Sequence, residues 1–347
     1  MEVFVSYGEL LDKFSILEIK REKINNQHVQ NEINVLMEKI NQLLIDPNLK
    51  FYYQMLKLIN LEIWNLSDQI RENKDSTLCL EIIKHNDRRF RVKNKINRSS
   101  PLKEQKSYPK QKCVFLGHLE SGDQLTNVGI VRYLSTIYDE VFVVSKPLNA
   151  KHVRSLYSDD DNINIIEMIL DYSTKPNFVF ENVVATGNFG EKKLNLAHFY
   201  NDFYSSIGLN PEFRFSYHHL PRNFQIEREL MEKIIPKDCS GYVFAHTRPG
   251  SSFEINSDLF IFDVSQNRYP EGHRWFKQWK IEYQNILLIN FSSLIENASE
   301  LYLSDSSFFC LASYLNLPET QVKNCFIANR YYDPSVYPST NQKWNFV

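Results

Sequence analysis

Asp123 is the first residue whose type and place could do chemistry, because it follows an apolar run, CVFLG, and a turn that contains Gly122. A carboxylate at the end of a buried strand can act as a general base that takes a proton from an acceptor hydroxyl. It can equally cap the helix that starts there by accepting hydrogen bonds from the first backbone N–H groups. The local sequence leaves both interpretations open, and capping is the commoner role of such an aspartate.

A second group of candidates follows the apolar run GYVFAH and consists of His246, Arg248, Ser251 and Ser252. A guanidinium binds two phosphate oxygens at once, and hydroxyls and a glycine-containing backbone add further donors. His246 could add a donor or carry a proton. The group is therefore a candidate anion site. The alternative is a surface loop in which His246 is packed and Arg248 pairs with a nearby glutamate.

The third group, Asp305, Ser306 and Ser307, follows the apolar run ELYLS and opens a predicted helix. Backbone N–H groups at a helix start, together with the helix dipole, favour a diphosphate. The carboxylate of Asp305 would repel phosphate, so we expect it to cap the helix or to accept a hydrogen bond from a sugar hydroxyl.

These candidates share one setting, since each follows an apolar run that alternates with helical segments. Such alternation is typical of an α/β protein with parallel sheets and helices on both faces. Two sets joined near Pro221 predict two Rossmann-like halves, residues 113–220 and 221–347, with a ligand crevice at the carboxyl ends of their strands. The strands are predicted at residues 113–117, 140–145, 163–168, 183–186, 241–246, 286–290, 300–304 and 325–329.

Other signals do not lead to a site. The run of aspartates at residues 159–161 precedes a strand, which favours a solvated turn over a metal site. His218 and His219 have no acidic or cysteine partner at ligand spacing, so zinc is not expected. The chain has no G-x-G-x-x-G, no Walker A and no G-x-S-x-G sequence, which argues against dinucleotide oxidoreductases, P-loop NTPases and α/β-hydrolases.

Residues 1–98 contain one Gly and one Pro and predict four amphipathic helices, hence an antiparallel helical bundle, hairpin or coiled coil. The expected apolar faces include Ile24 on the first helix, Ile59 on the third, and Leu80 and Ile83 on the fourth. Such a face is typical of core packing. A remaining helix surface could also form a homo-oligomer.

Residues 84–112 hold eleven basic and two acidic residues. Without interleaved aromatics this favours a solvated helix end followed by a flexible basic linker, residues 99–112, over a nucleic-acid site. The whole chain has 40 Lys+Arg and 42 Asp+Glu among 347 residues, and a net charge of −2, which also argues against a nucleic-acid partner.

The five scattered cysteines indicate reduced thiols and no disulfide framework. No run of about 18 apolar residues could span a bilayer, and no signal-peptide core is present. We therefore expect a cytoplasmic protein without an integral membrane segment.

Two stretches resemble known families. The opening VSYGELLDKFSILEIKREKI is similar to small helical proteins and domains of bacteria and viruses whose biochemical role is unassigned. FLGHLESGDQLTNVGIVRYLSTIYDEVFVVSKP and LIENASELYLSDSSFFCLASYL resemble glycosyltransferases with the two-Rossmann GT-B fold, of the ADP-heptose transferase type, over about residues 113–330.

The second resemblance implies a role for each candidate. Asp123 would be the catalytic base on the acceptor side, residues 113–220. Asp305, Ser306 and Ser307 would line the donor side, residues 221–347, with Asp305 on the donor sugar. AHTRPG is similar to a His-x-Arg segment of GT-B fucosyltransferases, which would put Arg248 on the donor diphosphate. The chain departs from the family where Ser307 replaces a glycine and Cys310 a histidine.

The implied activity is transfer of a hexosyl or heptosyl group from a nucleotide-diphosphate sugar to a glycan, lipid-linked or protein acceptor. No cofactor or metal is expected, because cationic and helix-terminal donors can stabilise the departing diphosphate. The alternative is a non-catalytic carbohydrate-binding or scaffold protein that assembles through its helical domain.

Overall fold

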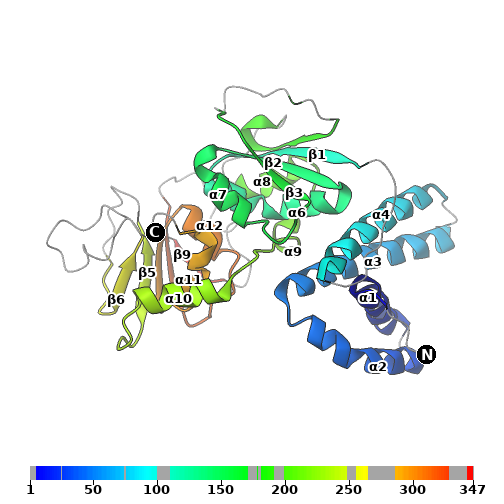
Figure 1. The fold of residues 1–347 in the computed structure, drawn as a ribbon, viewed down its shortest axis with the longest axis horizontal. Helices are drawn as coiled ribbons and strands as arrows, with labels where there is room; N and C mark the ends of the chain where they lie inside the picture. Colours follow the sequence, from blue (N-terminus) through cyan, green and yellow to red (C-terminus); the bar gives the residue numbers. More distant parts are fainter. Residues whose placement is uncertain are drawn as a thin grey trace. The chain divides into compact units, whose positions relative to one another are not determined.

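The computed structural model describes residues 5–24, 26–73, 76–99, 110–170, 178, 181–190, 199–247, 255–264, 286–327 and 342–346 (Figure 1). The chain forms two compact units. The first comprises Met1–Cys113, Arg132–Val141 and Asp159–Ile163, and the second comprises Val114–Val131, Phe142–Ser158 and Asn164–Val347. The predicted division at residues 98, 112 and 220 stays a prediction.

Helices occupy most of the described residues before residue 100. They are α1 (Tyr7–Ile24), α2 (Gln27–Leu43), α3 (Pro47–Asn73) and α4 (Cys79–Ile96), with short 3-10 turns η1 (Ser76–Leu78) and η2 (Asn97–Ser99). The sequence sets their starts: Asn26 caps α2 by accepting from the His28 N–H at 2.8 Å, and Pro47 takes the first position of α3, where no N–H is needed. Figure 1 shows α3 and α4 running side by side.

The core of these helices is made by Leu11, Phe14, Met55, Ile59 and Val92, among other buried side chains. Helix α1 lies along the second half of α4, as three contacts show: the Gly8 N–H donates to Asn97 Oδ1 at 2.6 Å, Lys93 pairs with Glu9, and Arg89 pairs with Asp12.

The prediction that all residues of these apolar faces are buried is wrong in part. Leu80 is 66% exposed and Ile83 58% exposed, whereas the ion pairs between α1 and α4 lie further along α4, at Arg89 and Lys93. Ile24, at the last turn of α1, is also exposed.

The basic side chains of α4 are engaged inside the first unit. Arg88, Arg91 and Lys95 are all buried, with Arg88 bonded to Glu62 and Thr136 and Arg91 to Asp139. The prediction of a solvated helix end is therefore wrong for this part of residues 84–112. Its acidic partners come from distant parts of the chain, so a count of local charges could not reveal them.

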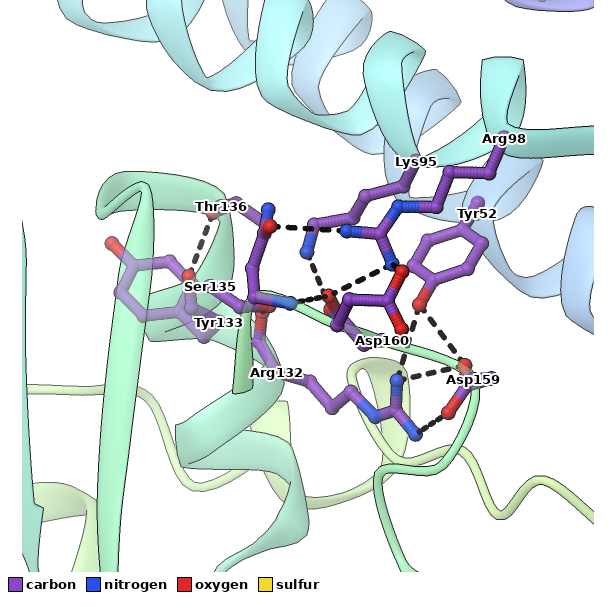
Figure 2. Close-up of polar contacts among 11 residues, drawn as sticks. Tyr52, Lys95, Arg98, Arg132, Tyr133, Ser135, Thr136, Asp159 and Asp160 are labelled. Atoms are coloured by element: carbon purple, nitrogen blue, oxygen red, sulfur yellow. Dashed lines mark hydrogen bonds and ion pairs between the residues drawn. The ribbon is translucent and has the colours of Figure 1, made fainter. Parts of the chain in front are cut away.

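Figure 2 shows the centre of these contacts, a buried charge network formed by Tyr52, Lys95, Arg132, Asp159 and Asp160. Asp159 accepts from both terminal nitrogens of Arg132, at 2.9 and 2.6 Å, and from the Tyr52 hydroxyl at 3.0 Å. Lys95 pairs with Asp160. Burial by itself would raise the pKa of Asp160, but Lys95 and Arg132 outweigh it, and its pKa lies below the usual range.

The same network corrects the expected solvated turn at residues 159–161. Asp160 is 1% exposed, and the side chain of Asp159 is nearly as deep. Only Asp161 behaves as expected, with 87% of its side chain exposed. Asp159 and Asp160 pair there with Arg132 of α6 and Lys95 of α4, which offsets part of the cost of removing their carboxylates from water.

The first α/β sheet has the strand order β3-β2-β1-β4, and β1 pairs with β4 in parallel. The strands are β1 (Lys112–Leu116), β2 (Glu140–Ser145), β3 (Ile163–Glu167) and β4 (Val183–Ala185). The helices and turns around them are α5 (Ser121–Thr126), α6 (Val128–Ile137), α7 (Pro147–Ser155), η3 (Gly187–Phe189), α8 (Phe199–Ser205) and α9 (Phe213–Ser216).

The second sheet has the order β6-β5-β7-β8-β9, with parallel pairing throughout. Its strands are β5 (Tyr242–His246), β6 (Phe260–Asp263), β7 (Glu300–Ser304), β8 (Val322–Phe326) and β9 (Asn345–Phe346). The accompanying helices and turn are α10 (Phe224–Ile234), η7 (Leu288–Phe291), α11 (Ser292–Glu296) and α12 (Ser307–Ala312).

Two parallel sheets with helices therefore agree with the predicted α/β class. One strand was predicted wrongly: the run at residues 286–290 forms the 3-10 turn η7, whose Leu288, Ile289 and Phe291 are buried. A short apolar run does not distinguish a strand from a buried turn. The edge strand β6 was not predicted.

Candidate functional site

The first part of the candidate site lies where β1 ends. Leu116 is the last residue of β1, His118 follows in the loop, and Asp123 lies in the first turn of α5. Asp123 is not the N-cap of this helix, since Glu120 takes that position. Its carboxylate instead faces His118, with 3.3 Å between His118 Nδ1 and Asp123 Oδ2. The loop after β1 thus brings an imidazole and a carboxylate together.

The second part of the site lies where β5 and β7 end. These neighbouring parallel strands place His246 and Ser304 at the same edge of the sheet, and Ser306 follows as the N-cap of α12. His246 Nδ1 lies 2.8 Å from Ser306 Oγ, and the tautomer of the ring decides which of the two atoms donates. Both side chains are partly exposed. The strand-end rule thus brings together two predicted residues that are 60 positions apart in the chain.

Hydrogen bonds brace the backbone around this second part. The Thr247 hydroxyl donates to Asp263 Oδ2 at 3.0 Å, which joins the residue after β5 to the end of β6. The N–H of Asp305 donates to the carbonyl of Phe326 at 3.0 Å, which joins the turn after β7 to the end of β8. The strand ends are therefore tied to one another and hold the intervening turns in place.

The two parts meet through α5 and α12 within the second unit. A Cβ atom added at Gly122 would lie 3.1 Å from Cys310 Sγ and 3.4 Å from the Cα of Ser307. The Tyr200 hydroxyl lies 3.4 Å from the same sulfur. The absence of a side chain at Gly122 therefore lets the start of α12 approach the first turn of α5, next to Asp123.

The pKa of the Cys310 thiol reflects the burial and the charges around this contact. Burial raises the pKa of its thiol to about 12, and the nearby carboxylates of Asp305 and Asp123 act in the same direction. The thiol is therefore neutral at physiological pH. Two predicted site residues from different sheets, Asp123 and Asp305, thus lie close enough to act on one sulfur atom.

We refer to His118, Asp123, His246, Ser306 and Ser307 as the strand-end site. Of the predicted residues, it unites Asp123 with His246, Ser306 and Ser307, and Asp305 lies beside them. Arg248, Ser251 and Ser252 lie outside the described residues, so their assignment to a diphosphate stays a prediction.

The sequence predictions did not include His118 among the site residues. The available signal was its position, directly after the first predicted strand and five residues before Asp123. Cys310 was noted only as a departure from a family pattern, and its burial against Gly122 depends on the approach of two helices, which the sequence does not show.

Metal-binding clusters were sought as well. Within the described ranges, no group of three or more His, Cys, Asp or Glu residues is placed to hold a metal ion. His218, at which the sequence analysis expects no zinc, stacks on Tyr314 with 3.7 Å between ring centroids. The absence of a cofactor stays a prediction. Among the helices that the structure describes, none is long and apolar enough to cross a membrane.

Comparisons with known proteins give weak likenesses only. No protein-family model matches the chain. No curated protein matches it either. Among solved structures it is similar to a family 9 glycosyl transferase from Veillonella parvula, with 10% identity, a TM-score of 0.37, and 70% of this chain and 88% of that chain covered.

Two other solved structures come from Escherichia coli. One is ADP-heptose LPS heptosyltransferase II, with 12% identity, a TM-score of 0.40, and coverage of 68% of this chain and 90% of that chain. The other is the iron-containing dodecameric glycosyltransferase TibC, with 13% identity, a TM-score of 0.39, and coverage of 64% and 59%. These TM-scores are too low to assign the chain to a family.

Proposed function

We propose that this chain is a glycosyltransferase that moves a sugar from a nucleotide-diphosphate sugar to a hydroxyl acceptor without a metal ion. The observation that carries the proposal is the contact of α5 with α12. It brings the carboxylate of Asp123 to the region of the His246–Ser306 pair, and these groups come from the ends of strands in two different sheets.

The chemistry of the two parts supports this assignment. Asp123, on residues 113–220, would take the proton of the acceptor hydroxyl as its oxygen bonds to the anomeric carbon. The bond between that carbon and the diphosphate oxygen breaks, and the diphosphate leaves with the electron pair. Donors on residues 221–347, namely His246, Ser306, Ser307 and the sequence-assigned Arg248, Ser251 and Ser252, would stabilise its charge. Asp305 would accept a hydrogen bond from the sugar.

The test is a panel of UDP-, GDP-, ADP- and CMP-sugars, measured by thermal shift and by release of the nucleoside diphosphate in the presence of EDTA. A true donor at about 100 times its Kd should stabilise the protein by about 2.7 kcal/mol. Arg248→Ala should reduce that stabilisation. If no nucleotide sugar stabilises the protein, the proposed function is wrong, and loss of turnover in EDTA alone would contradict metal independence.

Asp123→Asn separates the base from the binding groups. We expect turnover to fall by about 100-fold or more, while the donor Kd stays within about twofold, because the amide keeps the shape but takes no proton. Asp161→Asn is the matched control, since its side chain is 87% exposed in the other unit. Equal turnover in Asp123→Asn and wild type would exclude Asp123 as the base.

One observation favours a second candidate, a carbohydrate-binding or scaffold protein without catalysis. Cys310 stands where the resembled family has a histidine, and its buried, neutral thiol is packed against α5. A site altered in this way could bind a nucleotide sugar without transferring it. Donor stabilisation without release of nucleoside diphosphate, for every acceptor class tried, would support this second candidate.

A further inference from the structure

We propose that His118 is a positioning residue for Asp123: its imidazole holds one carboxylate oxygen so that the other can take the acceptor's proton. This inference rests on the proposed function and adds a residue to that site. The contact that carries it is the 3.3 Å separation of His118 Nδ1 and Asp123 Oδ2. An Nδ1–H donor at this distance fixes the orientation of the carboxylate.

The roles of the two side chains do not follow from their depth. The side chain of Asp123 is 16% exposed and that of His118 is 10% exposed, so both groups are shielded from water to a similar degree. The proposed function makes Asp123 the base, and the enclosed ring of His118 then acts through it.

The backbone of His118 is held independently of its ring. The side-chain amide of the fully buried Gln124 donates to the His118 carbonyl at 3.0 Å and to the Val144 carbonyl at 3.2 Å. This residue lies next to Asp123 in α5, so it links the loop after β1 to the end of β2 and to the helix of the catalytic carboxylate. These hydrogen bonds thereby restrain the distance between the backbones of His118 and Asp123.

The ring of His118 is enclosed by Phe199, Phe203 and Gly187, and we call this enclosure the seat. Phe199 and Phe203 of α8 meet the ring edge to face, with ring centroids 5.4 and 5.2 Å away. On another side lies Gly187, whose φ of +67° favours glycine. A Cβ atom there would lie only 2.2 Å from His118 Cδ2, so any other residue at position 187 would displace the imidazole.

The seat restricts the ring to an orientation that serves Asp123. With Oδ2 held by His118, the acceptor proton passes to Oδ1 while the acceptor oxygen bonds to the anomeric carbon and the diphosphate departs. A rotating carboxylate would present this oxygen only part of the time. Fixing the base should therefore raise kcat and leave donor binding almost unchanged.

The test compares three substitutions at one position. His118→Asn keeps an N–H donor close to the place of Nδ1, His118→Gln moves the donor outward, and His118→Leu removes it while still filling the seat. We expect kcat to fall about 10- to 100-fold in the Leu and Gln variants and to recover most of the wild-type value in the Asn variant. Donor KM should stay within about twofold in all three.

Gly187→Ala provides an independent variant, because it leaves His118 and Asp123 unsubstituted and displaces the imidazole of His118. Its kcat should fall as in His118→Leu. The kcat of the double variant His118→Leu/Gly187→Ala should be no lower than that of either single variant. Thermal unfolding of each variant checks that the fold is intact. Wild-type kcat in His118→Leu, or equal losses in the Asn and Leu variants, would overturn the positioning role.

A spectroscopic measurement separates this inference from the proposed function. In the full chain labelled with ¹⁵N-histidine, the Nδ1 resonance of His118 should show a hydrogen-bonded proton that is altered in Asp123→Asn. If the wild type transfers no sugar from any donor, the proposed function fails, whereas this resonance still reports the pair. An unchanged resonance in Asp123→Asn would overturn the pairing itself.

Discussion

The buried charge network and the strand-end site both concentrate polar side chains, but they differ in how much of them water can reach. In the network, Lys95, Arg132 and Asp160 are almost fully buried, and opposite charges lie in direct contact. In the strand-end site, His246, Ser306 and Ser307 are partly exposed at the ends of strands. The buried charges of the network must therefore stay paired for the first unit to be stable, whereas the strand-end site has polar surface available to a ligand.

The largest expected loss of stability comes from a substitution that breaks the buried charge network. Lys95→Met leaves the carboxylate of Asp160 buried without its closest cation, which should lower the free energy of unfolding by about 3–5 kcal/mol in urea titrations. The double variant Lys95→Met/Asp160→Leu should recover most of this loss, because it removes both charges.

Asp161→Asn serves as the matched control for that measurement and should change the free energy of unfolding by less than about 0.5 kcal/mol, since the side chain is exposed. If Lys95→Met were as stable as wild type, the buried carboxylate of Asp160 would not depend on its pairing with Lys95.

Acid should weaken the network next. The pKa of Asp160 is lowered in the folded chain, because Lys95 and Arg132 outweigh the effect of burial, so the folded state binds this proton less readily than the unfolded state. The resulting stability is present above the ordinary aspartate pKa of about 4 and is lost progressively as pH falls below it. Urea titrations between neutral pH and pH 3 measure this loss, which should be smaller in Lys95→Met/Asp160→Leu.

Apart from the control Asp161→Asn, the smallest expected effect on stability lies in the strand-end site. Ser306→Ala removes the hydroxyl that lies 2.8 Å from His246 Nδ1, in a partly exposed place where water can replace it. The free energy of unfolding should change by less than about 1 kcal/mol, while donor affinity falls about 3- to 10-fold. A large loss of stability with unchanged donor affinity would reverse the contrast between the two regions.

The sequence predicted the strand-end geometry better than the charge network. Parallel strands bring their carboxyl ends to one edge, so Asp123, His246 and Ser306 could be selected from the ends of apolar runs alone. The pairing of Lys95 with Asp160 could not be selected in this way, because it joins residues 65 positions apart that no local pattern connects. Both the basic and the acidic stretch were consequently interpreted as solvated.

The fold shows the same limit. The strands β1, β2, β5 and β7 coincide closely with predicted apolar runs, because buried parallel strands are apolar on both faces. The failures concern burial that depends on packing with distant residues. The apolar run of η7 could equally have formed a strand, and the apolar spacing of α4 does not show that Leu80 is left exposed.

The close approach at Gly122 has a practical consequence for labelling. Because Cys310 is buried against α5 and its thiol is protonated at neutral pH, an alkylating reagent can modify it only when α12 moves away from α5. In a variant with the exposed Cys79 and the partly exposed Cys239 replaced by serine, mass spectrometry can distinguish modification of Cys310 from that of the buried Cys113 and Cys325, and the rate at Cys310 then measures how often α12 moves away from α5.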